Sequence, residues 1–311
     1  MRLPRIASAA FLALALTACS GISLPDSATD SRLQQGLAHV QAVPNADRFS
    51  VTFYDVRTIR DTIGSDGTED YAGTRGSDLS PTQRWDLAAT SAPFSHLDFD
   101  PSRAPRTIPT PHTLGWTLYF IAFNPSATRV TVAGGAEDHH AYARTELAAA
   151  GWTENGDDWT NPQAQQVPAR KTNYRLADGN IYAEQPGTRG TSGPSAADPV
   201  LRDERLKPVL KCLDNPVAAH IVVSAQGTYA LGAAVDAAGN GQVWSCIHAP
   251  GDPQALADSL RPQYDWVEIV SSKVDGEVVR TELRVAERDP RTPGAIQLIQ
   301  RAPESVKPQL F

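Results

Sequence analysis

Three cysteines are the residues of this chain whose positions point most directly to chemistry. Cys19 lies directly behind an apolar run near the start of the chain, whereas Cys212 and Cys246 lie in its last third. A cysteine sulfur can act as a nucleophile, pair in a disulfide or bind a metal, and its surroundings decide between these roles. Each cysteine is therefore interpreted from the residues around it.

The surroundings of Cys19 are typical of a secretory signal. Arg2 and Arg5 form a short basic segment, residues 6–16 form an apolar run, and small residues precede Cys19. The apolar run is too short to cross a hydrocarbon core, which needs roughly 20 residues. The alternative to a lipid-attachment signal is an ordinary secretory signal in which the cysteine occurs by chance.

The segment Leu16-Thr17-Ala18-Cys19 resembles the lipobox of bacterial lipoproteins. The resemblance implies that the Cys19 thiol receives a diacylglyceryl group and that the chain is cut just before it. Residues 1–18 would then be a removable signal peptide. The resemblance further implies a protein that is lipid-anchored on the extracytoplasmic face of the cell membrane.

Residues 19–44 are expected to form a tether between this lipid and a folded body. The part at 20–30 is rich in Ser, Asp and Thr and poor in large apolar residues, so it favours a solvated chain. Acyl chains supply anchoring at about 0.8 kcal/mol per buried methylene group. We therefore expect the membrane, contacted through the N-terminal lipid, to be one partner of this chain.

Cys212 and Cys246 are predicted to form a disulfide. Outside the cytosol, two thiols that remain after lipidation of Cys19 usually pair. A bridge that closes a loop of this length stabilises the fold by about 3–4 kcal/mol in the chain-entropy model. A metal pair is the alternative, but no CxxC motif or Cys/His cluster accompanies either residue.

Length, composition and charge limit the classes of protein to which this chain can belong. The 311 residues suggest one large or two medium domains, and the 41% of hydrophobic residues can form a packed core. The net charge of −7 argues against a nucleic-acid partner, because a nucleic-acid-binding protein presents a basic face. A small ligand or an envelope protein is the expected second partner.

Two clusters contain residue types that bind metals, but their spacing favours structural roles. His139 and His140 point about 100° apart if they lie on one helix, so they rarely bind the same ion. Glu137 and Asp138 are acids that favour the start of a helix. The acidic loop lacks the calcium-binding spacing of an EF-hand; its acids are Asp61, Asp66, Glu69, Asp70 and Asp78.

Catalytic signatures are missing from the sequence. There is no GxSxG, HExxH, GxxxxGK[ST] or GxGxxG motif. Ser192 lies in the presumed linker, and the histidines at 96, 112, 220 and 248 are scattered. We therefore expect no catalytic residue, cofactor or metal, and a non-catalytic module that binds a ligand or a protein. An envelope hydrolase remains the alternative, because a catalytic triad is recognised by geometry rather than by sequence.

The sequence predicts strands that alternate with short helices, and these elements must position the residues discussed above. Period-2 patterns with β-branched and aromatic residues predict strands, and clusters of Gly, Pro, Ser and Asp predict turns. Helices are predicted at 85–97, at 139–150 with Asp138 as N-cap and Gly151 beyond its end, and after Asp252. Strands are predicted at 49–56, 118–123, 129–132, 221–223, 229–235, 242–247, 266–271 and 278–286. Loops are predicted at 64–82 and 100–113.

Two segments in this series match each other. Residues 138–152 and 252–266 both begin with Asp and end with Trp, and each follows a predicted hairpin. This match predicts an α+β fold of two similar units, each an antiparallel hairpin–helix–strand, packed as a tandem pair. The units correspond to domains at 45–190 and 197–311, the second of which contains the disulfide. The segment 184–199, rich in Gly, Pro and Ser, is the expected linker.

Trp152 and Trp266, which close the two matching segments, are expected to fill the core of their units. A helix that begins at Asp and ends in Gly-Trp, combined with a C-terminal cysteine pair, resembles uncharacterised lipoproteins of high-GC Gram-positive bacteria. The resemblance implies an envelope lipoprotein and no particular activity.

Overall fold

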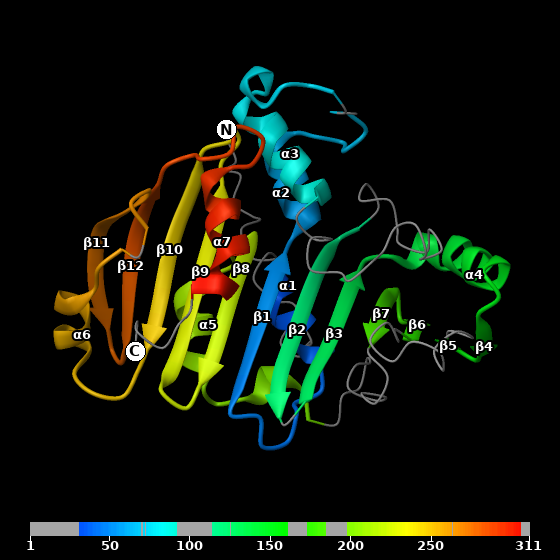
Figure 1. Ribbon diagram of the computed structural model, residues 1–311, viewed down its shortest axis with the longest axis horizontal. Coiled ribbons are helices and arrows are strands. Elements are labelled where there is room, and N and C mark those ends of the chain that lie inside the picture. The colour runs from blue at the N-terminus through cyan, green and yellow to red at the C-terminus, as the bar shows by residue number, and fades with distance from the viewer. Residues whose placement is uncertain are drawn as a thin grey trace, which may run out of the picture. The chain divides into compact units, whose positions relative to one another are not determined.

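One antiparallel sheet of 12 strands, in the order β11-β12-β10-β9-β8-β1-β2-β3-β7-β6-β5-β4, organises the described part of the chain (Figure 1). The computed structural model describes residues 31–69, 71, 73–91, 114–124, 126–160, 173–184, 198–262 and 264–305. The predicted α+β class is confirmed. The strands are β1 (Arg48–Tyr54), β2 (Trp116–Asn124), β3 (Ser126–Gly134), β4 (Thr153–Asn155), β5 (Asp158–Thr160), β6 (Asn173–Ala177), β7 (Asn180–Glu184), β8 (Ala218–Ser224), β9 (Gly227–Val235), β10 (Gly241–His248), β11 (Val267–Asp275) and β12 (Val278–Val285).

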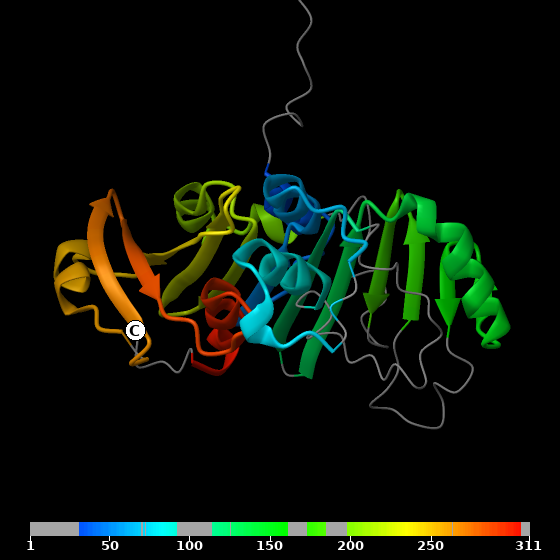
Figure 2. The same cartoon turned by 90° about the horizontal axis from the view of Figure 1, so that it is seen from above.

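Helices cover both faces of this sheet. Figure 2 shows α1 and α5 on one face and α3 and α7 on the other. We call these the α5 face and the α7 face. The helices are α1 (Arg32–Ala38), α2 (Val56–Ile63), α3 (Pro81–Ser91), α4 (His140–Ala149), α5 (Lys207–Leu213), α6 (Pro253–Ser259) and α7 (Gly294–Ser305). Short 3₁₀ turns lie at η2 (Gly76–Asp78), η5 (Glu137–His139) and η8 (Val200–Arg202).

The alternation of side chains along the strands divides the core between the two faces. In β10, Trp244 and Cys246 belong to a cluster that also contains Leu213 of α5. Val243 of the same strand belongs to a second cluster that contains Ile296 of α7. Ser245 lies between Trp244 and Cys246 and therefore points to the α7 face. A third cluster packs Leu147 and other residues of α4 against β3 and its neighbours at the β4 end.

The two predicted domains share this sheet. Strand β1 of the first domain pairs with β8 of the second, from Phe49 opposite Val223 to Tyr54 opposite Ala218. Residues from Ser31 to Phe311 accordingly fall into one compact unit. The sheet runs without a break through the ranges 45–190 and 197–311, so two separately packed units are not established.

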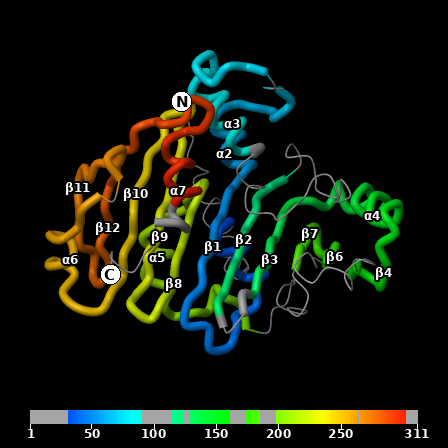
Figure 3. The backbone as a smooth tube through the Cα atoms, viewed as in Figure 1, coloured from blue at the N-terminus to red at the C-terminus, as the bar shows by residue number. Residues whose placement is uncertain are grey.

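The expected hairpin–helix–strand order does occur in both halves of the chain, as Figure 3 shows. In the first half the chain runs from the β2–β3 hairpin through α4 to β4, and β7 then returns to pair with β3. In the second half it runs from the β9–β10 hairpin through α6 to β11, and β12 returns to pair with β10. Each returning strand therefore lies beside the strand that precedes the helix.

The predicted tether at 19–44 is too long at its C-terminal end. Helix α1 lies within that range, and its Leu33 and Leu37 are buried in the cluster on the α5 face. Ser31 and Gln34 form a capping box that starts the helix. The two leucines are four residues apart, so both lie on one side of the helix, which explains why a polar-looking segment packs onto the sheet. The signal peptide, Cys19 and residues 20–30 lie outside the described residues.

The residues predicted at the helix ends are confirmed at two positions and wrong at a third. Asp252 caps α6, as predicted, by accepting a hydrogen bond from the Gln254 backbone. Gly151 follows α4 with a φ of 76°, as predicted for a residue just beyond a helix. The prediction for Asp138 is wrong, because it lies inside the η5 turn and α4 begins after His139 without a side-chain cap.

Removal of one buried hydroxyl is expected to stabilise the fold. Tyr54 is only 2% exposed, and among the described residues its hydroxyl has no hydrogen-bond partner. An unpaired buried hydroxyl costs roughly 1–3 kcal/mol, so Tyr54→Phe should raise the free energy of unfolding in urea by about 1 kcal/mol. Tyr71→Phe is the matched control; it removes a hydroxyl that donates to Asp86 over 2.9 Å and should lower stability. A Tyr54→Phe variant less stable than the wild type would contradict this prediction.

Candidate functional site

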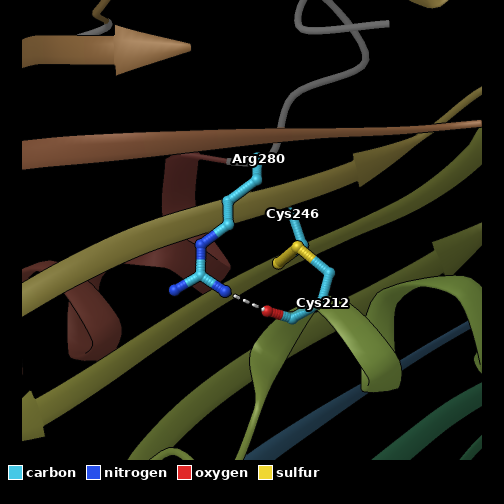
Figure 4. Close-up of a disulfide and its surroundings, with 3 residues drawn as sticks. All are labelled: Cys212, Cys246 and Arg280. Carbon is cyan, nitrogen blue, oxygen red and sulfur yellow. Dashed lines mark hydrogen bonds between the residues drawn. A yellow bond between two sulfur atoms is a disulfide. The ribbon is translucent and has the colours of Figure 1, made fainter. Parts of the chain in front are cut away.

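The two C-terminal cysteines are bonded to each other in the structure. The disulfide joins α5 to β10, as Figure 4 shows for Cys212 and Cys246. Arg280 of β12 donates a hydrogen bond of 2.7 Å to the backbone oxygen of Cys212, and its guanidinium lies 5.1 Å from the ring centroid of Trp244. Arg280 thereby supplies a positive charge at the C-terminal end of α5, where it is favourable. The geometry assigns the disulfide a structural role on the α5 face.

The histidine pair and the acidic loop have local structural partners. The His140 ring nitrogen Nε2 lies 3.0 Å from the backbone oxygen of Asn180, and the His139 ring contacts Tyr142. Burial lowers the pKa of His139. In the acidic loop, an Asp66 carboxylate oxygen accepts hydrogen bonds from the backbone and hydroxyl of Thr68. No group of three or more His, Cys, Asp or Glu side chains among the described residues is arranged to hold a metal ion.

A cavity opens on the α7 face of the second half, on the opposite side of the sheet from the disulfide. Its volume is about 70 Å³, several times the roughly 10–15 Å³ that one ordered water needs and about half of the roughly 150 Å³ that accommodate benzene, so a ring-sized ligand would extend past its solvent-facing side. The floor is formed by strands β9, β10, β11 and β12, and the walls by α7 and by the segment between α6 and β11. The lining residues are Tyr229, Leu231, Ser245, Ile247, Leu260, Arg261, Pro262, Tyr264, Val267, Ile269, Thr281, Leu283 and Leu298.

Most of the cavity wall is apolar, and its polar groups are mainly hydroxyls. Ser245 of β10 lies directly opposite Thr281 of β12, and both are almost fully buried. The Thr281 hydroxyl lies 3.1 Å from that of Ser272, so it has a partner. Tyr229 is half-buried, and burial raises the pKa of its hydroxyl, which therefore stays protonated. The cavity includes no Asp, Glu or His, so its described walls hold no carboxylate or imidazole to act as a general base.

Helix α6 and the segment that follows it lie beside the cavity, and they are less buried than the other helices of the second half. Helix α6 contains no buried residue. Arg261 follows it and donates hydrogen bonds to the backbone oxygens of Asp258 and Leu260, so its guanidinium is tied to the end of the helix. Leu260, Arg261 and Pro262 are half-buried or exposed, and they form the solvent-facing part of the cavity wall.

A second, polar hollow lies beside strands β5, β6 and β7. Arg175 donates a 2.8 Å hydrogen bond to Asp158, and Glu184 lines the same hollow. Its volume of about 10 Å³ suits a single ordered water. Nearby, the Tyr182 hydroxyl lies 3.1 Å from a His39 ring nitrogen, and burial raises the pKa of Tyr182 to about 12. This hollow is too small to admit a substrate.

A second hydroxyl–imidazole pair also has the separation expected of a nucleophile and its base. The Thr52 hydroxyl lies 3.0 Å from the Nδ1 atom of His220. Both residues are buried, with exposed fractions of 3% and 0%, so no substrate reaches the hydroxyl in this structure. The pair is therefore assigned a structural role between β1 and β8.

Sequence reasoning identified the cysteines but missed the cavity. The strands that form its floor were predicted, yet the side chains that meet there come from residues 229–298 and from five elements. The local signal was a hydroxyl residue within an otherwise apolar strand, at Ser245. That signal does not distinguish a serine facing a cavity from one that faces a neighbouring element.

Comparison of the chain with models of protein families, with curated proteins and with solved structures gives no match. In the described part of the chain, none of the helices combines the length and the apolar character needed to span a membrane.

Proposed function

We propose that this chain is a lipid-anchored protein on the extracytoplasmic face of the cell membrane, whose folded body is a non-catalytic module that holds a small ligand. The observation that carries the proposal is the cavity on the α7 face, whose described lining residues are mostly apolar, include several hydroxyls and include no Asp, Glu or His. Concave, mostly apolar sites with a few polar groups are typical of small-molecule binding. A hydrolytic site would instead be expected to gather a base and carboxylates.

The N-terminal segment and the disulfide support the proposed location. Leu16-Thr17-Ala18-Cys19 has the residues expected for lipid attachment, in the expected order after a basic and an apolar segment. The disulfide between Cys212 and Cys246 suits an oxidising compartment outside the cytosol. Net charge, at −7, does not favour nucleic acid as a partner.

Comparison of the two halves supports a binding role for the cavity. We propose that β2–β3–α4–β4 and β9–β10–α6–β11 are copies of one hairpin–helix–strand unit. In the first copy, Ala143 and Leu147 of α4 are fully buried against the sheet. In the second, α6 buries no residue, and the cavity occupies the space between the sheet and the segment that follows the helix. The second unit therefore has a cavity at the place where the first unit has the buried side chains of α4.

Native mass spectrometry of the full-length protein, extracted gently from its own envelope, tests this function. The expected result is a discrete additional mass that is lost on unfolding. In Leu283→Trp, a larger side chain fills part of the cavity from β12, and the additional mass should be absent. Ile121→Trp is the matched control, because it makes a similar change at another half-buried strand position and should keep the mass.

A clean mass for the wild-type chain without any adduct would contradict a ligand-binding role and favour a protein partner. An adduct that persists in Leu283→Trp would contradict the assignment of the ligand to this cavity.

A further inference from the structure

Three hydroxyls that line the cavity, those of Ser245, Tyr229 and Tyr264, form no hydrogen bond to another protein group among the described residues, and the first two lie on strands of the cavity floor. Ser245 is 5% exposed, and its side chain lies between the strand positions of Leu231 and Thr281 on the cavity floor. Tyr229 lies on the neighbouring strand and also lines the cavity. Within the residues that the structure describes, neither hydroxyl is hydrogen-bonded to another protein group, in contrast to Thr281.

A hydroxyl that faces a cavity and has no protein partner can donate or accept a hydrogen bond to a group inside the cavity. The remaining lining of the cavity is mostly aliphatic and aromatic, from residues such as Ile247, Leu283 and Leu298. These walls favour an apolar body, whereas the two hydroxyls favour one polar group attached to it.

We propose that the cavity binds a neutral, largely apolar molecule that carries a hydroxyl or carbonyl oxygen, and that Ser245 and Tyr229 bind this oxygen. The proposal rests on the binding function proposed above and specifies the chemical class of the ligand. Tyr229 donates its proton to the ligand oxygen, and Ser245 can either donate or accept. None of the described lining residues is an acid that could pair with a cationic ligand. Arg261, the one cation among the described lining residues, already donates to the backbone at the end of α6.

The two faces of β10 have different surroundings, and Ser245 lies on the face opposite the disulfide. Its neighbours Trp244 and Cys246 point to the α5 face, where the disulfide and Arg280 hold the strand. A strand that is held on one face positions the side chains on its other face accurately. The serine is therefore placed on a fixed part of the sheet, whereas the outer wall of the cavity belongs to the less buried α6 region.

Two probes that differ only by a hydroxyl test the proposal. Toluene and p-cresol have the same ring and methyl group, and p-cresol adds one hydroxyl. Binding of each is titrated by ligand-observed NMR to the full chain carrying Cys19→Ala, so that no detergent competes for apolar probes. We expect p-cresol to bind about 5–10-fold more tightly than toluene, which corresponds to one or two net hydrogen bonds.

Three variants assign the preference to the named residues. Ser245→Ala and Tyr229→Phe should each reduce the preference for p-cresol, and together they should abolish it. Ser245→Thr keeps a hydroxyl at this position and should keep the preference. Urea unfolding of each variant shows whether the fold is retained.

The possible failures are distinguishable. If toluene binds as tightly as p-cresol, and Leu283→Trp blocks both, the cavity binds apolar molecules but the inference about its hydroxyls is overturned. If neither probe binds the folded protein, the inference is also overturned, and a clean native mass of the protein from its envelope then overturns the proposed function as well.

Discussion

Replacement of Cys19 by alanine is expected to release the protein from the membrane. The proposed anchor is a lipid on the Cys19 thiol, and alanine has no sulfur to receive it. Acyl chains contribute about 0.8 kcal/mol per buried methylene, so their loss removes most of the membrane affinity. In the described residues no helix can replace the anchor by spanning the bilayer. Fractionation of cells into membrane and soluble parts, followed by detection of the protein, measures the effect.

The control for this change is Ser20→Ala, which alters the adjacent residue and should leave the protein in the membrane fraction. Incorporation of a radiolabelled fatty acid should occur in the wild type and in Ser20→Ala but not in Cys19→Ala. Membrane association of Cys19→Ala that survives a high-salt wash would refute the lipid anchor.

Loss of the disulfide is expected to have the largest effect on stability. The bridge joins residues separated by 34 positions and connects α5 to β10, the third strand from one edge of the sheet. In the chain-entropy model, a loop of this size contributes about 3–4 kcal/mol. The double variant Cys212→Ala, Cys246→Ala should therefore lower the free energy of unfolding in urea by that amount. Alanine suits the Cys246 site because that residue is fully buried.

Reduction of the wild type supplies the control for this prediction. A thiol reductant should shift the wild-type unfolding curve towards that of the double variant and should leave the variant unchanged. Equal stabilities of the oxidised wild type and the double variant would show that the bridge does not constrain the unfolded chain as expected.

Local patterns in the sequence were sufficient to predict most strands. The alternation around Phe49, Val51 and Phe53 predicted β1, which the structure places at Arg48–Tyr54. The strands predicted at 266–271 and 278–286 likewise correspond to β11 and β12, which pair with each other. These patterns suffice because a half-buried strand must alternate between core and solvent or between two cores. The predicted core role of Trp266 is also confirmed, since it is 7% exposed in the cluster on the α7 face.

Several helices were missed because their signals are short. Asp55 caps α2 by accepting hydrogen bonds from the backbone and hydroxyl of Thr58, but this residue was assigned to the end of a strand. Ser80 and Gln83 form reciprocal side-chain to backbone hydrogen bonds that start α3 at Pro81, whereas the helix was predicted to begin only at Trp85. Such caps become informative only when an apolar helix face can be matched to a sheet, which depends on tertiary packing.

The pairing of β1 with β8 had no local signal. Thr52 and His220 lie opposite each other across this pair although 168 residues separate them in the chain. Pairing between such distant segments depends on the complementarity of whole faces and not on turn residues. The same reason applies to the cavity, because its lining residues come from elements that meet only after the sheet has formed.

A crystal structure of the full-length protein, purified gently from its own envelope, is the most direct test of the proposed binding site. We predict electron density for a bound molecule in the cavity on the α7 face, with an oxygen within hydrogen-bond distance of Ser245 and an apolar body against Leu283 and Leu298. A cavity that contains only ordered water, in protein that carries no adduct, would contradict the proposed function.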